Sequence, residues 1–275
     1  MSGISKAVKK CMEEAIQSDF EELDLQDQGI VNIADIPHLL QLRNITTLVL
    51  SHNRIVKLPD AIANCQGLEN LNLFNNELEM LPTTICNLPK LKFLNCGVNN
   101  LRELPKGIGT CPQLEMLDLT YNHLNERSLT RNFFYLQPLR ALYLGDNEFV
   151  SIPTDIKNLV NLNILVLRDN DIVSLPKEVG ELTKLKELHV QGNRLRVLPP
   201  EFANLDLSSS GFLLKWHENL WVASVLDQLV LGTSHLQQYL KTDEWKNEYE
   251  KHVVENKPPP PKGKTSKKKK DEKKK

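Results

Sequence analysis

The sequence lacks the patterns that mark a membrane-spanning or secreted protein. No apolar run approaches the roughly 20 residues that a membrane-spanning helix needs. The first 20 residues mix Lys and Glu with apolar residues, whereas a secretory signal has a continuous apolar core. Ser2 stands where N-myristoylation requires glycine, and Lys275 is no prenylation site. We therefore expect a cytoplasmic protein, with the nucleus as an alternative compartment.

Cysteine is scarce, with five residues, and forms no C-x-x-C pair. An odd number of unclustered cysteines favours free thiols in a reducing compartment over a disulfide framework. The seven histidines show no metal-ligand spacing such as H-E-x-x-H, and the chain has neither a glycine-rich phosphate loop nor a nucleophile motif. We expect no catalytic activity, no cofactor, no bound metal and no small-molecule substrate.

Charge is nearly balanced over the whole chain but unevenly distributed. The net charge at pH 7 is -1, yet residues 257–275 hold ten lysines against two acids, so this end carries +8 and the preceding residues carry -9. Such a segment cannot bury a core, and we expect 256–275 to be a disordered tail. It lacks the interleaved aromatics that stack on bases, so specific nucleic-acid recognition is not expected. Nuclear import, loose nucleic-acid contact and attraction to acidic lipids stay open as roles for it.

The dominant feature is an internal repeat of the form L-x-x-L-x-L-x-x-N-x-L-x-x-L-P. Seven copies begin at Ile45, Leu68, Leu91, Leu114, Leu139, Leu162 and Leu185, with spacings of 23, 23, 23, 25, 23 and 23 residues. A degenerate eighth copy begins at Phe20, with Gln28 in the asparagine slot. This pattern is typical of a leucine-rich-repeat solenoid. We predict an α/β fold of that kind, with a short parallel β-sheet on the concave face and helical caps at both ends.

Each column of the repeat has a physical explanation. The L-x-L pair alternates with period two and sends both side chains inward from a short strand. The asparagine follows where the chain leaves the strand, and because its amide both donates and accepts, the stacked asparagines are expected to form a ladder. The proline then fixes an extended backbone on the convex side. Cys65, Cys96 and Cys111 stand in apolar columns and are predicted to be buried hydrophobic residues.

The repeat sets the expected domain boundaries. A solenoid exposes its core at both ends and needs caps. We predict an N-terminal capping helix over 1–17, about eight repeats over 18–207, a C-terminal cap over 208–255 and the tail over 256–275. The cap should contain about two helices, broken near Gly232, and the three tryptophans should seal the last repeat. In the 25-residue copy, Phe133 or Phe134 is expected to pack into the core, with an extra convex contact site as the alternative.

Positions three, five, seven and eight of each copy lie on the concave sheet or its rim and are free to determine specificity. Aromatic and apolar residues gather there in the middle copies, bordered by acidic residues and one arginine. Exposed aromatics on a rigid face, rimmed by charge, are typical of protein-binding hot spots. The predicted contact residues are Phe74, Phe93, Met116, Asp118, Tyr121, Tyr143, Asp146, Val166, Arg168 and His189. The alternative is that these residues are merely scattered on a surface without function.

Several stretches are more specific than the repeat alone. They are LVLSHNRIVKLP, LDLTYNHLNERSLTRNFFYLQPLRALYLGDNEF and LRDNDIVSLPKEVGELTKLKELHVQGNRLRVLPPEFANLDL, together with a lysine-rich end. These stretches resemble the Ras suppressor protein family. The similarity spans nearly the whole chain. The 25-residue copy with NFFYL is the most specific match, since the 23-residue copy is shared with many intracellular proteins. The segment SSSGFLLKWHENLW and the oligolysine end diverge from the family.

The resemblance implies a non-enzymatic adaptor of cell–matrix adhesions. Its partner would be the last LIM domain of PINCH, in the complex with integrin-linked kinase and parvin, and it would dampen Ras-linked signalling. The family binds through the concave face, which agrees with the residue pattern, and we expect the protein alone to be monomeric. Two alternatives stay open. One is a scaffold that acts directly on a small GTPase or a phosphatase, and the other is a membrane- or nucleic-acid-associated protein that depends on the tail.

Overall fold

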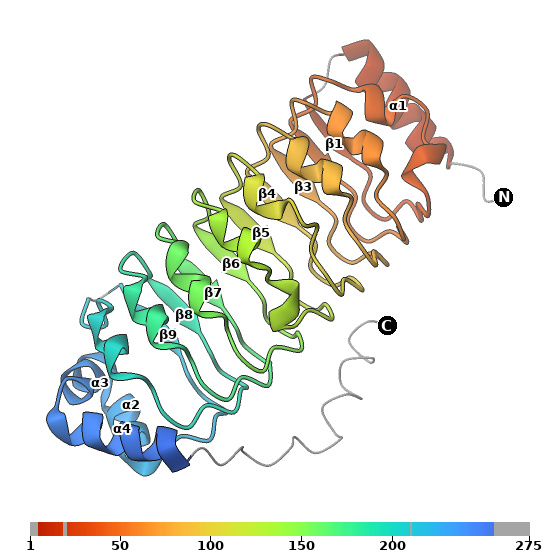
Figure 1. The fold of residues 1–275 in the computed structure, drawn as a ribbon. Helices are drawn as coiled ribbons and strands as arrows, with labels where there is room; N and C mark the ends of the chain where they lie inside the picture. Colours follow the sequence, from red (N-terminus) through yellow and green to blue (C-terminus); the bar gives the residue numbers. More distant parts are fainter. Residues whose placement is uncertain (1–4, 19–20, 210, 256–275) are drawn as a thin grey trace.

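Each copy of the repeat contributes one short strand. In the computed structural model, which describes residues 5–18, 21–209 and 211–255, nine such strands form one parallel sheet in chain order (Figure 1). They are Glu22–Asp24 (β1), Thr47–Val49 (β2), Asn70–Asn72 (β3), Phe93–Asn95 (β4), Met116–Asp118 (β5), Ala141–Tyr143 (β6), Ile164–Val166 (β7), Glu187–His189 (β8) and Leu213–Lys215 (β9). The predicted solenoid with a short parallel sheet is confirmed.

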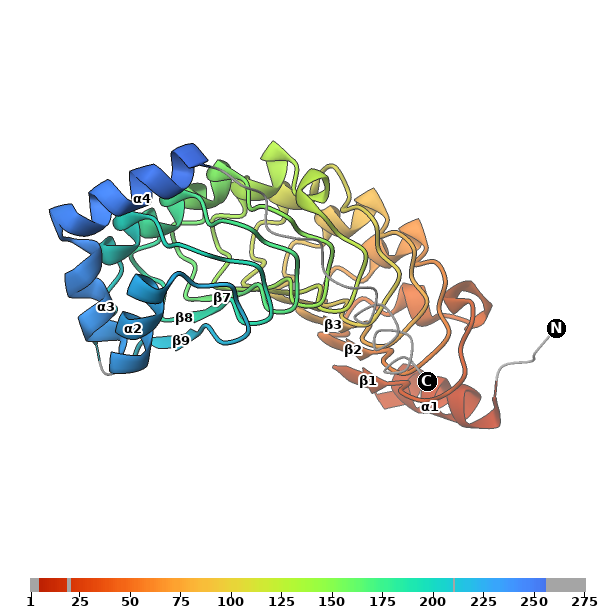
Figure 2. The ribbon, with the colours of Figure 1, turned by 90° about the horizontal axis from the view of Figure 1, so that it is seen from below.

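The other side of each coil carries a short 3-10 helix. These helices are Ile33–Asp35 (η1), Leu39–Gln41 (η2), Asp60–Asn64 (η3), Thr83–Asn87 (η4), Ile108–Thr110 (η5), Glu126–Ser128 (η6), Arg131–Tyr135 (η7), Thr154–Asn158 (η8), Lys177–Glu181 (η9) and Pro200–Asn204 (η10). Several follow a proline of the repeat, such as Pro59 and Pro153, whose backbone is extended with φ of -73° and -60°. Because strands are spaced more closely than helices, the stack bends, and Figure 2 shows the strands on its inner, concave edge.

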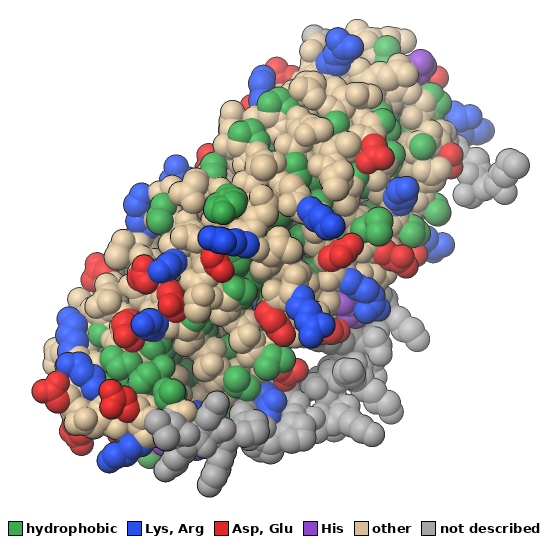
Figure 3. Space-filling model, in the orientation of Figure 1, with side chains coloured by type: hydrophobic (Ala, Val, Ile, Leu, Met, Phe, Trp, Pro, Cys, Tyr) green, Lys and Arg blue, Asp and Glu red, His purple; other side chains and the backbone are tan. Residues whose placement is uncertain are grey.

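The core is one continuous stack of leucines between the sheet and the 3-10 helices. The central residue of each strand pairs in register with its counterpart on the next, as Leu94, Leu117 and Leu142 do, and all three are fully buried. In the 25-residue copy both Phe133 and Phe134 are buried, so its extra length serves packing. Figure 3 shows the convex side, where charged side chains of both signs are scattered and hydrophobic side chains gather near the C-terminal coils.

The asparagine ladder lies where the strands end. Asn122 illustrates it: its Nδ2 donates to the carbonyl oxygens of Cys96 and Leu119, each at 3.0 Å, and its Oδ1 accepts from the Leu101 N–H at 3.0 Å. One side chain therefore serves backbone groups of its own coil and of the preceding one. Because these groups are buried and lack sheet partners, the amide satisfies what would otherwise be unpaired polar atoms.

The N-terminal end is covered by the helix Lys6–Ser18 (α1). Val8, Met12 and Ala15 follow one another at helical spacing and are buried against the first coil. The Ser5 hydroxyl donates to Gln28 Oε1 at 3.2 Å, which joins the start of the helix to the first coil. This placement agrees with a capping role, whereas the predicted tail over 256–275 and the start of the first copy at Phe20 lie outside the described residues.

The sheet continues past residue 207, where we expected the repeats to end. Strand β9 pairs with β8 in the same register as the preceding strands. Asn219 takes the ladder position, since its Nδ2 donates to the Val190 carbonyl at 2.9 Å and its Oδ1 accepts from the Leu195 N–H at 3.0 Å. Trp216 stands at the second inward leucine position of the repeat. Residues 211–222 are therefore a ninth coil and not part of a helical cap.

Three helices follow that coil: Ala223–Leu231 (α2), Thr233–Leu240 (α3) and Asp243–Glu255 (α4). The expected break at Gly232 is present, with a φ of 117° that favours glycine. A second break separates α3 from α4, because the Thr242 hydroxyl caps the next helix by accepting from the Trp245 N–H at 3.2 Å. Of the three tryptophans only Trp245 is fully buried, and its Nε1 donates to the Leu198 carbonyl at 3.2 Å.

Candidate functional site

Positions three and five of each copy flank the inward leucine and form two rows across the concave sheet. Row five contains Asp24, Val49, Asn72, Asn95, Asp118, Tyr143, Val166, His189 and Lys215. Row three contains Glu22, Thr47, Asn70, Phe93, Met116, Ala141, Ile164, Glu187 and Leu213. The ten expected contact residues come from six successive copies. At about 4.8 Å between strands, they span about 24 Å of one face.

The centre of this face combines an aromatic ring with a carboxylate. Tyr143 on β6 is the register partner of Asp118 on β5. The ring is half-buried, and burial, followed by the charges of Asp118 and Glu187, raises the pKa of the Tyr143 hydroxyl. The phenol therefore stays protonated at neutral pH and offers an O–H donor beside an acceptor. Met116, also half-buried, extends the apolar part of the patch along β5.

Two of the expected contact residues offer little surface. Val166 is only 4% exposed, because this short side chain lies between the larger Tyr143 and His189 in its row. Asp146 is 7% exposed, because Arg168 pairs with it. These two residues support their neighbours and present almost no area to a partner.

Asp118 has a structural role that the sequence pattern did not reveal. Its Oδ1 accepts from the Thr120 N–H at 2.9 Å, two residues along the chain. Asn72 and Asn95 make the same contact on β3 and β4, at 3.0 and 2.9 Å. In these copies position five ends the strand with a side-chain turn, and an amide performs this task as well as a carboxylate. The charge of Asp118 is therefore not needed for the turn and is available to a partner.

Position eight forms the rim, where the backbone turns through the left-handed region. Its residues are Asp27, His52, Asn75, Val98, Tyr121, Asp146, Asp169, Gly192 and Glu218, with φ between 53° and 69°. Asn, Asp and Gly tolerate this conformation. Val98 does not fit it, because a β-branched side chain with a φ of 55° is strained. The neighbouring coils hold this residue in place.

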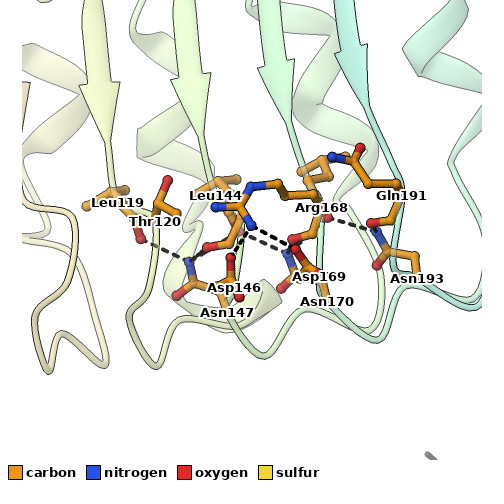
Figure 4. A network of polar contacts seen from close by, with 12 residues as sticks. Leu119, Thr120, Leu144, Asp146, Asn147, Arg168, Asp169, Asn170, Gln191 and Asn193 are labelled. Atoms are coloured by element: carbon orange, nitrogen blue, oxygen red, sulfur yellow. Dashed lines mark hydrogen bonds and ion pairs between the residues drawn. The ribbon is translucent and has the colours of Figure 1, made fainter. Parts of the chain in front are cut away.

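Arg168 organises the acidic side of the rim (Figure 4). Its Nη1 lies 2.6 Å from Asp146 Oδ2 and 2.7 Å from Asp169 Oδ2. Its guanidinium also lies over the Tyr121 ring, 5.5 Å from the centroid, where a cation is attracted to the aromatic face. The one arginine at this border is thus held by its own chain. It is a fixed part of the surface and does not extend freely toward a partner.

Two glycines at position seven, Gly97 and Gly145, let long side chains of neighbouring coils lie flat across the rim. The repeat pattern did not predict this role. A Cβ atom at Gly145 would approach Arg168 Cγ to 3.0 Å, and one at Gly97 would approach Phe74 Cδ2 to 3.2 Å. A larger residue at either position would push its neighbour out of place. In the sequence, the sign of this role is a glycine at position seven, where the other copies have a residue with a side chain.

The two predicted phenylalanines lie at the N-terminal side of the patch. Phe74 packs edge-on against the His52 ring, with centroids 5.4 Å apart, and crosses Gly97. Phe93 on β4 is 39% exposed, which is high for so large an apolar side chain. Together they extend the apolar surface from the centre toward the first coils.

His189 and Gln191 lie at the C-terminal side of the patch. Within the part of the chain that the structure describes, the buried atoms His189 Nε2 and Gln191 Oε1 have no hydrogen-bond partner. Burial, then the charge of Lys215, lowers the pKa of His189. The imidazole is therefore neutral at pH 7. Buried polar atoms are usually paired, so these two are suited to accept or donate hydrogen bonds when a partner covers them.

The described residues contain no arrangement typical of a catalytic centre. No group of three or more His, Cys, Asp or Glu side chains among them is placed to hold a metal ion. Burial raises the pKa of the Cys65 thiol to about 11 and also raises that of Cys96, as expected for inert core thiols. Cys86 accepts a hydrogen bond from Cys111, which lowers the pKa of Cys86, yet both are buried. Over residues 5–18, 21–209 and 211–255, no helix is long and apolar enough to cross a membrane.

The chain is similar to known leucine-rich-repeat proteins over most of its length. A family model described as "Leucine-rich repeat region" matches residues 19–144 and 110–254. Ras suppressor protein 1 of Homo sapiens and of Bos taurus are each 60% identical to this chain over 253 residues, which is 92% of the chain and 91% of the relative. The Mus musculus protein is 56% identical over the same shares.

Solved structures with a similar fold include plant receptors. The Arabidopsis receptor kinase HAESA, in complex with the peptide hormone IDA and the co-receptor SERK1, aligns with a TM-score of 0.62 and 28% identity over 74% of this chain and 35% of that one. The plant peptide hormone receptor RGFR1, in complex with RGF2, aligns with a TM-score of 0.56 and 22% identity over 66% and 30%. The chain spans about a third of these receptors, and the likeness concerns the repeat fold.

Proposed function

This chain belongs to the Ras suppressor protein family of leucine-rich-repeat proteins, and we propose that it is a non-enzymatic adaptor that binds a LIM-domain protein through its concave face. The proposed partner is the last LIM domain of PINCH, in the complex with integrin-linked kinase and parvin at cell–matrix adhesions. The proposed consequence is modulation of Ras-linked signalling. The name of the relatives, Ras suppressor protein 1, supports the link to Ras, whereas PINCH and the adhesion site rest on the family resemblance.

The observation that carries the proposal is the pairing of Tyr143 with Asp118 at the centre of a rigid face. An aromatic anchor with a hydroxyl, surrounded by half-buried apolar side chains, is typical of a binding hot spot. The backbone beneath it is fixed by the sheet and by the asparagine ladder, so a partner need not order it on binding. Polar atoms of His189 and Gln191 border the same patch.

The charges of the face indicate what the partner's surface should carry. Arg168 pairs with both Asp146 and Asp169, so one arginine stands against two carboxylates at the rim. Asp118 on the sheet adds a further negative charge and leaves the central face acidic, whereas Glu187 lies near the cation of Lys215 on β9. A complementary partner surface has an apolar centre and cationic side chains around it.

The proposed function is tested by comparing partners of different classes. The full-length chain is mixed with the last LIM domain of PINCH, or with a Ras-type GTPase loaded with GDP or with a GTP analogue, and binding is measured by size-exclusion chromatography and calorimetry. We expect a 1:1 complex with the LIM domain and none with the GTPase. If the chain binds the GTPase and not the LIM domain, the adaptor proposal is wrong and the chain acts directly on the GTPase.

A further inference from the structure

A second surface lies on the opposite side of the molecule from the concave sheet. A groove of about 1140 Å³ separates α4 from the convex-side segments of the last coils. Figure 2 shows α4 running along the outer edge of the stack at its C-terminal end. Val150, Val173 and Val197 from successive coils line one wall, and Tyr249 and Val253 from α4 line the other. In Figure 3 hydrophobic side chains gather over this part of the convex side.

The apolar side of α4 is packed on the core in its first half and is less covered toward Val253. Trp245, Tyr249 and Val253 are spaced four residues apart and form one apolar stripe of the helix. Trp245 is fully buried, Tyr249 is half-buried against the core, and Val253 is 51% exposed. The stripe is thus progressively uncovered toward the end of α4. On the facing wall Val150 is 45% exposed, so apolar surface is open on both sides.

The charge of the groove is opposite to that of the body of the protein. Five cationic side chains line it, Lys177, Arg194, Arg196, Lys241 and Lys246, against the carboxylates of Glu201 and Glu250. Lys246 also pairs with Asp243 at 2.9 Å, so five cations stand against three carboxylates. Residues 1–256 as a whole carry -9. A local excess of cations in an acidic body attracts an anionic partner and disfavours a cationic one. The lysine-rich segment 257–275 has the same sign as the groove and is therefore not its complement.

We propose that this groove binds an acidic segment of a partner protein, which inserts apolar side chains between α4 and the coils. Its volume exceeds the roughly 300 to 1,000 Å³ of small-molecule pockets, and a peptide segment fits it better. The site lies outside the concave face, so one molecule can hold a partner on each side. The inference does not depend on the identity of the concave-face partner.

The test begins with an unbiased peptide selection. Random twelve-residue peptides displayed on phage are selected on the immobilised full-length protein, and an enriched peptide is labelled with fluorescein and titrated by fluorescence anisotropy. We expect the enriched peptides to carry net negative charge together with large apolar residues. Selection of peptides without a negative bias overturns the proposal, as does failure to enrich any sequence.

Variants then locate the binding site. Arg196→Glu/Lys241→Glu should weaken binding of the enriched peptide at least tenfold, and Val253→Ser at least threefold. The matched control Lys106→Glu/Arg131→Glu makes the same change in net charge at exposed positions of earlier coils and should change the affinity less than twofold. Circular dichroism melting confirms that each variant is folded. An equal loss in the control variant means that overall charge, and not the groove, holds the peptide, and overturns the proposal.

Four further measurements separate the groove from competing sites. Truncation after Asn256 removes the ten lysines, and the affinity should change less than twofold. Tyr143→Ala, on the concave face, should also leave it unchanged. Polyglutamate, which lacks apolar side chains, should bind at least tenfold more weakly than the enriched peptide. The proposal is overturned if truncation or Tyr143→Ala abolishes binding, or if polyglutamate binds as tightly as the enriched peptide. It is also overturned if vesicles containing phosphatidylserine displace the peptide, because the groove would then bind membranes.

Discussion

The guanidinium of Arg168 lies 5.5 Å from the ring centroid of Tyr121, which belongs to a coil two positions earlier in the stack. Its side chain crosses the intervening coil above Gly145 and pairs with Asp146 there. One arginine therefore ties three coils together at the rim. This tie makes the rim of the concave face a fixed surface, and its loss should be visible in stability as well as in binding.

Replacing Arg168 with alanine should lower the free energy of unfolding by about 1 to 3 kcal/mol, because it leaves the buried Asp146 carboxylate without its cation. Urea unfolding measures this change. Asp146→Asn keeps the shape and tolerates the left-handed backbone, so a double-mutant cycle between the two positions should give a coupling above about 0.5 kcal/mol. If the two changes in unfolding free energy simply add, the contact between Arg168 and Asp146 does not stabilise the fold.

Val98→Asn should stabilise the protein, because asparagine adopts the left-handed backbone at less strain than a β-branched residue. The penalty for an ordinary residue there is about 1 to 2 kcal/mol, so we expect a gain of about 1 kcal/mol in thermal or urea unfolding. The reciprocal change Asn75→Val, in the same column, should destabilise by at least as much, since it also removes the contact between Asn75 Nδ2 and His52 Nδ1 at 2.9 Å. A loss of stability in Val98→Asn contradicts the strain.

Asn122→Ala should lower stability by roughly 1 to 3 kcal/mol, because the buried carbonyls of Cys96 and Leu119 and the N–H of Leu101 lose their partner. Partner affinity, measured on the folded variant, should stay within twofold. Asn87→Ala, at an exposed position of η4, is the control and should change stability by no more than about 0.5 kcal/mol. Equal melting temperatures for the two variants would mean that the ladder contacts of Asn122 do not stabilise the fold.

The lowered pKa of His189 makes a prediction about pH. The unfolded chain binds a proton at the ordinary histidine pKa of about 6.5, whereas the folded imidazole binds it only at lower pH. Between these two values the unfolded state holds more protons, so the free energy of unfolding falls as the pH drops below about 6.5. His189→Gln should flatten this part of the profile in urea unfolding from pH 7.5 to 5. The control is His235→Gln on the exposed side of α3, and identical profiles for wild type and His189→Gln would contradict the burial of the imidazole.

The regular part of the fold was predictable because each column has a fixed physical role. Once Asn122 and its counterparts are in register, the neighbouring leucines must point inward and positions three and five outward. The ninth coil was harder to find. Gly211 replaces its first leucine, Trp216 replaces another, and it starts 26 residues after Leu185. The pairing of β9 with β8 and the backbone contacts of Asn219 reveal it.

The contacts of the candidate site were less predictable, because they depend on how side chains cross between coils. The sequence places Arg168 and Val166 at outward positions but does not say which neighbour covers them. The arginine lies over Gly145, and the valine is covered by Tyr143 and His189. Likewise, the groove beside α4 depends on where the helix separates from the coils, and helical periodicity alone places Val253 on the buried stripe.

Calorimetry of the last LIM domain of PINCH with folded variants of the full-length chain tests whether the concave face around Tyr143 binds the partner. Tyr143→Ala should weaken binding by roughly thirtyfold, since truncating a central aromatic anchor typically costs about 2 kcal/mol. Asp118→Asn keeps the turn to Thr120, as Asn72 and Asn95 do, but removes the charge, so it should weaken binding by about threefold to tenfold.

The convex variants Lys106→Glu and Lys157→Glu complete this calorimetric comparison, because they change charge at exposed positions on the other side of the same coils. We expect wild-type affinity for both convex variants and a large loss for Tyr143→Ala. Wild-type binding by Tyr143→Ala and Asp118→Asn, together with loss of binding in a convex variant, would contradict this expectation.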